Sequence, residues 1–244
     1  MRILRFFEKL LTKIVSLFFK QQFDREKYHF NFSEVWFSPW DKDERFNLIY
    51  DQIRNNTLLS KRKLFDLYLI GIQQDKLKAN FLEIGTLRGG SAAMLLSSFS
   101  GEKLLLWDNW KGGGAHISKD DYFLSKEYSI AADLQETQNL LSMLYPEFID
   151  QYSFINDIFP NNIKLNHAFN HLSLVHFDIY DSHSFIIGID LLWTKLMHGG
   201  IFIVSAYGSI SLNSLTDAVN NVVKSKPDCF FVQSQSGMGL MIKR

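Results

Sequence analysis

The sequence predicts an α/β fold: a doubly wound, mostly parallel sheet of seven strands, preceded by an N-terminal helical extension. Three observations support this prediction. Apolar strand-like runs alternate with helix-like segments along residues 45–244. Most of the strand candidates are continuous apolar runs, as expected when helices cover both faces of a sheet. A glycine turn at Gly85 also joins the first strand candidate to an apolar helix, a connection typical of doubly wound sheets.

Seven segments are expected as strands, and helices fill the intervals between them. The strand candidates are residues 81–85, 103–107, 152–156, 172–178, 200–204, 229–232 and 239–242. The helix candidates are residues 90–99, 133–144, 182–197 and 212–225, with two more helices within 45–75. Gly112-Gly-Gly114 is expected to form a flexible loop over the site.

Length and composition narrow the class of protein. A chain of 244 residues with 46% hydrophobic and 15% aromatic residues can bury a substantial core. Lys+Arg and Asp+Glu both number 26, so no net charge recruits nucleic acid. The single Cys229 excludes an internal disulfide and a cysteine-based zinc site, and it fits a reducing compartment. We therefore expect a cytoplasmic protein, since no run approaches about 20 uncharged apolar residues.

Residues 1–44 are expected to form an extension of different character, with residues 45–244 as the main domain. Residues 1–20 predict an amphipathic helix whose polar stripe consists of Arg2, Arg5, Lys9, Lys13, Ser16 and Lys20. Residues 21–44 are aromatic and irregular. The helix has two alternative uses: docking on the protein's own domain or on a second subunit, as in a homo-oligomer, or peripheral contact with a membrane surface. Charges interrupt any secretory apolar region, which disfavours a signal peptide.

The segment from Glu83 to Ser91 is the strongest candidate for ligand binding. A strand, a glycine turn and a helix let backbone N–H groups and the positive end of the helix approach a ligand. The spacing differs from the phosphate loop and from the dinucleotide-binding pattern. A turn used only for packing is the alternative. The candidate binding residues here are Glu83, Gly85, Arg88, Gly89, Gly90 and Ser91.

Polar residues at the ends of the next two strands extend this candidate site. Asp108 follows Gly85 by 23 positions, an offset at which an acidic side chain can bind ribose hydroxyls. Asn156 and Asp157 end the third strand candidate and can contact an adenine amino group, or form a plain turn.

Asp178 and His176 are the candidate catalytic residues. A carboxylate that closes a buried strand is costly unless it is paired or used, and Asp178 is in that position. His176 shares its strand face by period two. A core histidine bonded to a backbone carbonyl is the alternative for His176.

Five blocks, in order, resemble the macrocin O-methyltransferase family and related polysaccharide-cluster methyltransferases. They are FLEIGTLRGGSAAMLL, LLLWDNWKG, FINDIFPNNI, VHFDIYDSH and LLWTKLMHGGIFIVSAYGS, and the resemblance covers residues 45–244. It implies the fold of class I methyltransferases that use S-adenosylmethionine (SAM). It also implies that the Glu83–Ser91 loop holds SAM and that Asp108 serves the nucleoside part. Members of this family methylate sugar hydroxyls with the help of a magnesium ion held by aspartates at two strand ends.

The chain departs from the family where the resemblance places magnesium. Asp178 matches one ligand, but His176 stands where the family has the other aspartate of that pair, and Ser205-Ala206 replaces an Asp-Asp pair. Magnesium generally requires more than one carboxylate. We therefore expect no metal ligands of the family type and no magnesium ion.

Two hypotheses follow. In the first, the chain is a metal-independent O-methyltransferase that acts on a hydroxyl of a sugar-like or natural-product small molecule, with His176 or Asp178 as the base. In the second, it is a catalytically silent binding or scaffold protein in a glycan or natural-product pathway. A nucleotide-sugar or NAD enzyme has only fold analogy in its favour.

Overall fold

The computed structural model describes residues 38–111, 133–161, 170–209 and 212–244. Residues from Trp40 to Arg244 form one compact unit. The predicted N-terminal amphipathic helix and the glycine loop at 112–114 lie outside the described residues. Among the described residues, no helix has the length and apolar character needed to span a membrane.

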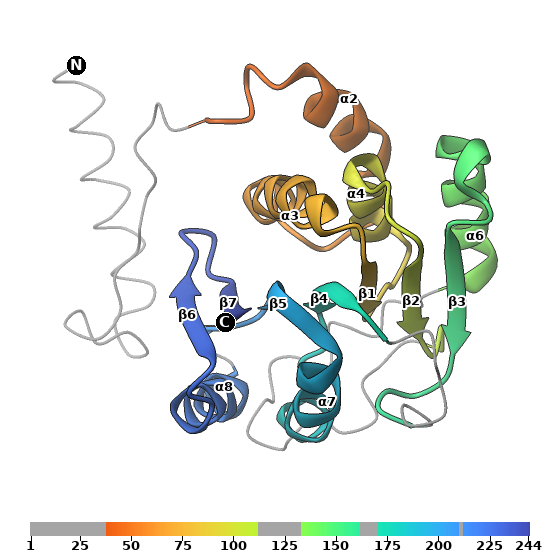
Figure 1. Cartoon of the computed structure of the whole chain (residues 1–244). Coiled ribbons are helices and arrows are strands. Elements are labelled where there is room, and N and C mark those ends of the chain that lie inside the picture. The colour runs from red at the N-terminus through yellow and green to blue at the C-terminus, as the bar shows by residue number, and fades with distance from the viewer. Residues whose placement is uncertain (1–37, 112–132, 162–169, 210–211) are drawn as a thin grey trace, which may run out of the picture. The chain divides into compact units, whose positions relative to one another are not determined.

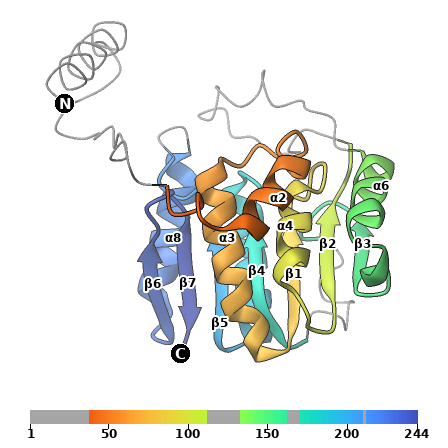
Figure 2. The same ribbon diagram turned by 90° about the horizontal axis from the view of Figure 1, so that it is seen from above.

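The predicted seven-stranded sheet is confirmed, with the strand order β3-β2-β1-β4-β5-β7-β6. Its strands are β1 (Asn80–Ile84), β2 (Leu104–Asp108), β3 (Tyr152–Asn156), β4 (Leu172–Phe177), β5 (Leu196–Val204), β6 (Cys229–Gln233) and β7 (Gly239–Lys243). Neighbouring strands from β3 through β5 pair in parallel, whereas β7 is antiparallel to both β5 and β6. Figure 2 shows this order across the sheet.

The described helices match the predicted segments closely. They are α2 (Glu44–Ile53), α3 (Lys61–Gln74), α4 (Gly90–Ser98), α6 (Leu134–Leu144), α7 (Ser182–Lys195) and α8 (Asn213–Ser225), with short 3₁₀ turns at Asp75–Leu77 and Pro146–Phe148. The largest difference at a helix boundary is in α7, which ends at Lys195 instead of residue 197. Leu196 is extended and pairs with Leu172 of β4, so β5 begins there and not at residue 200.

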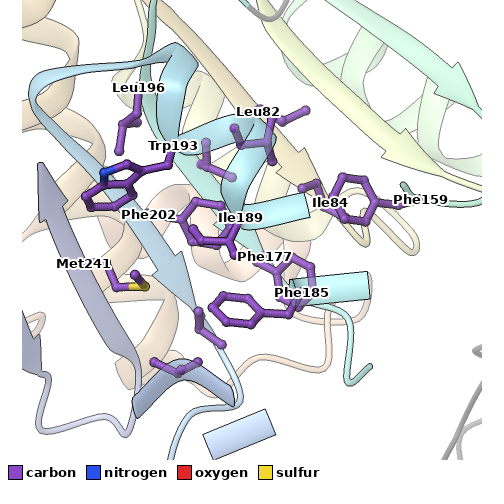
Figure 3. Packing of buried hydrophobic residues seen from close by; sticks show 14 of the residues in the cluster. Leu82, Ile84, Phe159, Phe177, Phe185, Ile189, Trp193, Leu196, Phe202 and Met241 are labelled. Carbon is purple, nitrogen blue, oxygen red and sulfur yellow. The ribbon is translucent and has the colours of Figure 1, made fainter. Parts of the chain in front are cut away.

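Helices cover both faces of the sheet. The helices α2, α3 and α4 lie on one face and α7 and α8 on the other (Figure 1). Figure 3 shows part of the core between the sheet and α7, where Phe177 and Phe202 meet Phe185. The opposite core joins Phe81 and Leu174 to apolar side chains of α2, α3, α4 and α6.

Strand alternation decides which face receives the polar site residues. Leu82 and Ile84 of β1 point into the core with α7, while Phe81 points into the core with α3 and α4. Because side chains alternate along a strand, Glu83 lies on the α3 and α4 face. His176 lies on the same face, since it is in register with Glu83 across the β1–β4 pair.

Candidate active site

The glycine turn brings the carboxyl ends of β1 and β4 into direct contact. Gly85 has φ of +91°, and a Cβ there would lie 2.7 Å from the backbone oxygen of Asp178. The Gly85 N–H donates to the carbonyl oxygen of Trp107 at 2.9 Å, which ties the turn to β2 as well. Only glycine fits this conformation and this close approach without strain.

The helix that follows the turn presents its positive end at the same edge of the sheet. Gly89 caps α4 with φ of +82° and has no side chain that could accept from the first turn. The N–H of Gly90 is bonded to the carbonyl oxygen of Asn56 at 3.1 Å. Ser91, in the first turn, is buried. The first turn of α4 therefore carries a partial positive charge beside the ends of the strands.

Asp108 holds the glycine turn in place. Its two carboxylate oxygens accept from the backbone N–H groups of Leu87 and Trp110, each at 2.9 Å. The Thr137 hydroxyl of α6 donates to the carbonyl oxygen of Leu87 at 3.1 Å, so the turn is also fixed from that side. Each carboxylate oxygen can accept a second hydrogen bond, so this role leaves Asp108 able to bind a ligand hydroxyl.

The other predicted cofactor residues lie at the same edge with different neighbours. Asn156 is exposed and in register with Asp108. Asp157 accepts from the N–H of Ile158 at 2.7 Å, and its own N–H donates to the backbone oxygen of Asp108 at 3.1 Å. Arg88 Nε lies 3.7 Å from a carboxylate oxygen of Glu136 on α6.

Three buried side chains from adjacent strands form a hydrogen-bonded chain. His176 Nδ1 lies 2.9 Å from Glu83 Oε1, and His176 Nε2 lies 2.6 Å from Ser205 Oγ. All three residues have an exposed fraction of 0%. His176 is thus a buried core histidine, as in the alternative that the sequence left open, but both of its ring nitrogens are bonded to side chains and not to a backbone carbonyl.

This chain of contacts favours the positively charged form of His176. Burial by itself lowers the pKa of His176, but the hydrogen bond to Glu83 and the charges of Asp178 and Glu83 outweigh it, and the net pKa is raised above its ordinary value. The imidazolium donates from both nitrogens, to Glu83 Oε1 and to Ser205 Oγ. His176 thus has no free ring nitrogen in this arrangement.

Asp178, like Glu83, retains a buried carboxylate oxygen without a hydrogen-bond partner. In Asp178 this atom is Oδ1. Burial raises the pKa of Asp178 to about 6, although the charges of His176 and Lys63 oppose the shift. Asp178 is therefore ionised at neutral pH and is a stronger base than an ordinary aspartate.

Lys63 of α3 reaches the same place from across the fold. Its Nζ donates to the backbone oxygen of Ser205 at 2.5 Å. Burial lowers the pKa of Lys63, and the nearby Asp178 charge opposes this shift. A cation thus lies where β5 ends, close enough for its charge to interact with that of Asp178.

Sequence reasoning missed Lys63 and two threonines. The Thr86 hydroxyl follows the glycine turn, is buried and has no partner, and Thr137 supports the turn. The signal for Lys63 is its place in the run Lys61-Arg62-Lys63 directly after the N-cap Ser60. Helix N-termini disfavour cations, so three in one first turn indicate a use other than helix stability.

The residues at this edge fit SAM. Glu83 Oε2 is a buried carboxylate oxygen without a hydrogen-bond partner, and such an atom is costly unless a donor reaches it. The ammonium group of a methionine moiety is a donor of this kind. Asp108 can accept from ribose hydroxyls as described above, and the first turn of α4 suits a carboxylate.

The same residues do not fit a magnesium ion. Magnesium prefers six oxygen ligands in octahedral geometry. Asp178 offers a carboxylate, but His176 is engaged on both sides, Ala206 has no oxygen in its side chain, and the Lys63 ammonium would repel a divalent cation. Within the described part of the chain, no three His, Cys, Asp or Glu side chains are grouped to hold a metal.

The strand order, the antiparallel β7 and the glycine turn after β1 define the class I methyltransferase fold. The structure is similar to that of the O-methyltransferase NovP, with a TM-score of 0.64 and 17% identity over 77% of this chain and 82% of that chain. The calicheamicin methyltransferase CalS11 gives a TM-score of 0.60 and 11% identity, over 91% of this chain and 97% of that one.

A third similar structure contains the cofactor. The O-methyltransferase TomG from Streptomyces achromogenes, involved in tomaymycin synthesis and solved in complex with SAM, gives a TM-score of 0.53 and 13% identity over 83% of this chain and 90% of that chain. No protein-family model matches the sequence, and no curated protein matches it. The structural likeness shows the fold.

Proposed function

We propose that the chain is a SAM-dependent O-methyltransferase that acts on a hydroxyl group of a sugar or natural product without a magnesium ion. One observation carries the proposal. Asp178 adjoins the glycine turn so closely that a Cβ on Gly85 would lie 2.7 Å from the backbone oxygen of Asp178. The raised pKa of Asp178 suits a general base. The candidate base and the candidate cofactor loop therefore form one site.

SAM, when bound, supplies an electrophilic methyl group on a sulfonium. Glu83, Gly85 and Ser91 would hold its methionine part, and Asp108 its ribose. Asn156 and Asp157 follow on the neighbouring strand, where the adenine would lie. The remaining requirement is an acceptor oxygen held in line with the methyl carbon, and such positioning can lower a barrier by about 7–11 kcal/mol.

Asp178 is the proposed base. Its Oδ1 atom has no partner and can accept the proton of an acceptor hydroxyl. His176, which the sequence nominated as a second candidate, is better suited to a positioning role because both of its nitrogens are bonded to Glu83 and Ser205. It fixes the charge balance around Asp178 and does not contact the acceptor.

Similar folds in NovP, CalS11 and TomG support the choice of natural-product hydroxyls as acceptors. Calorimetric titration with SAM tests the first part of the proposal, with binding expected in the presence of EDTA. Release of S-adenosylhomocysteine in the presence of a panel of hydroxylated sugars and glycosides tests the second. Asp178→Asn separates cofactor binding from methyl transfer, because this variant should bind SAM with unchanged affinity and release no product.

The outcomes separate the proposal from its alternative. Absence of SAM binding would overturn the cofactor assignment and the function with it. Binding without product release from any acceptor would favour the silent binding protein. Ser205 and Ala206, which stand where the family resemblance places two aspartates, support that alternative. Activity that EDTA abolishes and magnesium restores would contradict the metal-independent mechanism.

A further inference from the structure

Lys63 is placed at the carboxyl edge of the sheet at a cost to the helix that carries it. The first turn of α3 contains no acidic residue and begins with Lys61, Arg62 and Lys63, although the positive end of a helix disfavours cations. The far end of the helix lies at the opposite edge, where Gln74 donates to the backbone oxygen of Gly199 at 3.2 Å. The helix α3 therefore runs antiparallel to the parallel strands, and its first turn lies at their carboxyl ends.

The neighbouring lysine in the same turn has a different environment. Lys61 Nζ lies 4.7 Å from the centre of the Tyr50 ring, which is a cation–π contact with a side chain of α2. Lys63 Nζ instead donates to the Ser205 backbone oxygen at 2.5 Å and interacts with the charge of Asp178. An ammonium has three donors, so Lys63 can donate to a further oxygen atom at the end of β5, where its charge interacts with that of Asp178.

We propose that the Lys63 ammonium binds the acceptor oxygen and supplies the positive charge that the family resemblance would assign to a magnesium ion. This inference rests on the proposed function. As Asp178 takes the hydroxyl proton, the oxygen electron pair forms the new O–C bond to the methyl carbon. The C–S bond breaks at the same time, and its electron pair stays on sulfur. Lys63 keeps its protons throughout and stabilises the negative charge that develops on oxygen.

The first test compares three single variants. Lys63→Met should lower the rate of methyl transfer by about 10²–10³-fold, as removal of a preorganised donor does, with SAM affinity within twofold of the wild type. Lys63→Arg cannot act as a base and should retain more activity than Lys63→Met. Lys61→Met is the matched control and should keep the wild-type rate. A Lys63→Met rate within threefold of the wild type would overturn the proposal, as would equal losses in the Met and Arg variants.

The second test does not depend on activity. If the Lys63 ammonium occupies the position of a metal ion, the Ala206→Asp variant alone should bind no Mn²⁺ that electron paramagnetic resonance can detect. The double variant Lys63→Ala/Ala206→Asp should bind it, and the further change Asp178→Asn should abolish that binding. Equal Mn²⁺ binding with and without Lys63, or none in the double variant, would reject the assignment. If the wild type binds SAM but methylates nothing, the proposed function fails and the catalytic role of Lys63 fails with it, whereas this measurement still shows whether Lys63 occupies the position of a metal cation.

Discussion

The pair formed by Glu83 and His176 makes a quantitative prediction about stability. Both side chains are fully buried and 2.9 Å apart. Glu83→Gln keeps the shape and an acceptor oxygen but removes the charge. A hydrogen bond to a charged group contributes about 1.5–3 kcal/mol and a neutral one about 0.5–1.5 kcal/mol. We therefore expect the free energy of unfolding to fall by about 1–1.5 kcal/mol, or roughly 2–6 °C in Tm for a domain of this size.

The loss should depend on pH in a defined direction. The pKa of His176 is raised in the folded protein, so its charged form stabilises the fold below the unfolded value of about 6.5. That contribution disappears as the pH rises through the folded pKa. Glu83→Gln should therefore cost more stability at pH 6 than at pH 9.

Urea denaturation followed by circular dichroism at the two pH values measures both effects. The matched control is Glu102→Gln, which removes the same charge from an exposed side chain and should change stability by less than about 0.5 kcal/mol. Equal losses of unfolding free energy for Glu83→Gln at pH 6 and pH 9 would refute the reasoning. They would mean that the charged form of His176 does not depend on the charge of Glu83.

Three further predictions concern the cofactor loop and the base. Gly85→Ala should lower stability in thermal unfolding by more than Gly237→Ala does. Both glycines have positive φ, which alone costs an alanine about 1–2 kcal/mol, but only at Gly85 would the new Cβ lie 2.7 Å from a backbone atom. Equal losses of stability in the two variants would contradict the close approach at Gly85. Asp108→Asn replaces one of the two carboxylate oxygens that accept from Leu87 and Trp110. It should weaken SAM binding, measured by calorimetry, by at least about tenfold, which is the equivalent of one charged hydrogen bond. An unchanged affinity would show that Asp108 does not bind the cofactor. Burial raises the pKa of Asp178 to about 6. The methylation rate should therefore be constant above that pH and fall about tenfold per pH unit below it. A rate that stays constant down to pH 5 would exclude Asp178 as the base.

The sheet and the glycine turn after β1 could be predicted because their signals are local. Seven apolar runs of strand length and one glycine turn are enough to suggest the doubly wound fold, and the positions of Asp108 and Asp178 follow from the rule that ligands bind at the carboxyl ends of strands. The end of α7 was misplaced by two residues because Leu196 and Met197 are apolar and continue the helical pattern. The pairing of Leu196 with Leu172 is a tertiary contact, and it ends the helix.

The amino-acid sequence by itself determined which residues could act at the site: Glu83, Gly85, Asp108, His176 and Asp178 all lie at strand ends that local patterns identify. Only the tertiary structure decided how they are paired. The β1–β4 register places Glu83 against His176, which is 93 residues away along the chain, and α3 brings Lys63 to Ser205 across 142 residues. No local periodicity encodes such contacts, because they depend on which strands become neighbours and on the face over which each helix packs. For the same reason the sequence could not indicate that the Lys63 ammonium reaches the end of β5, where its charge interacts with that of Asp178.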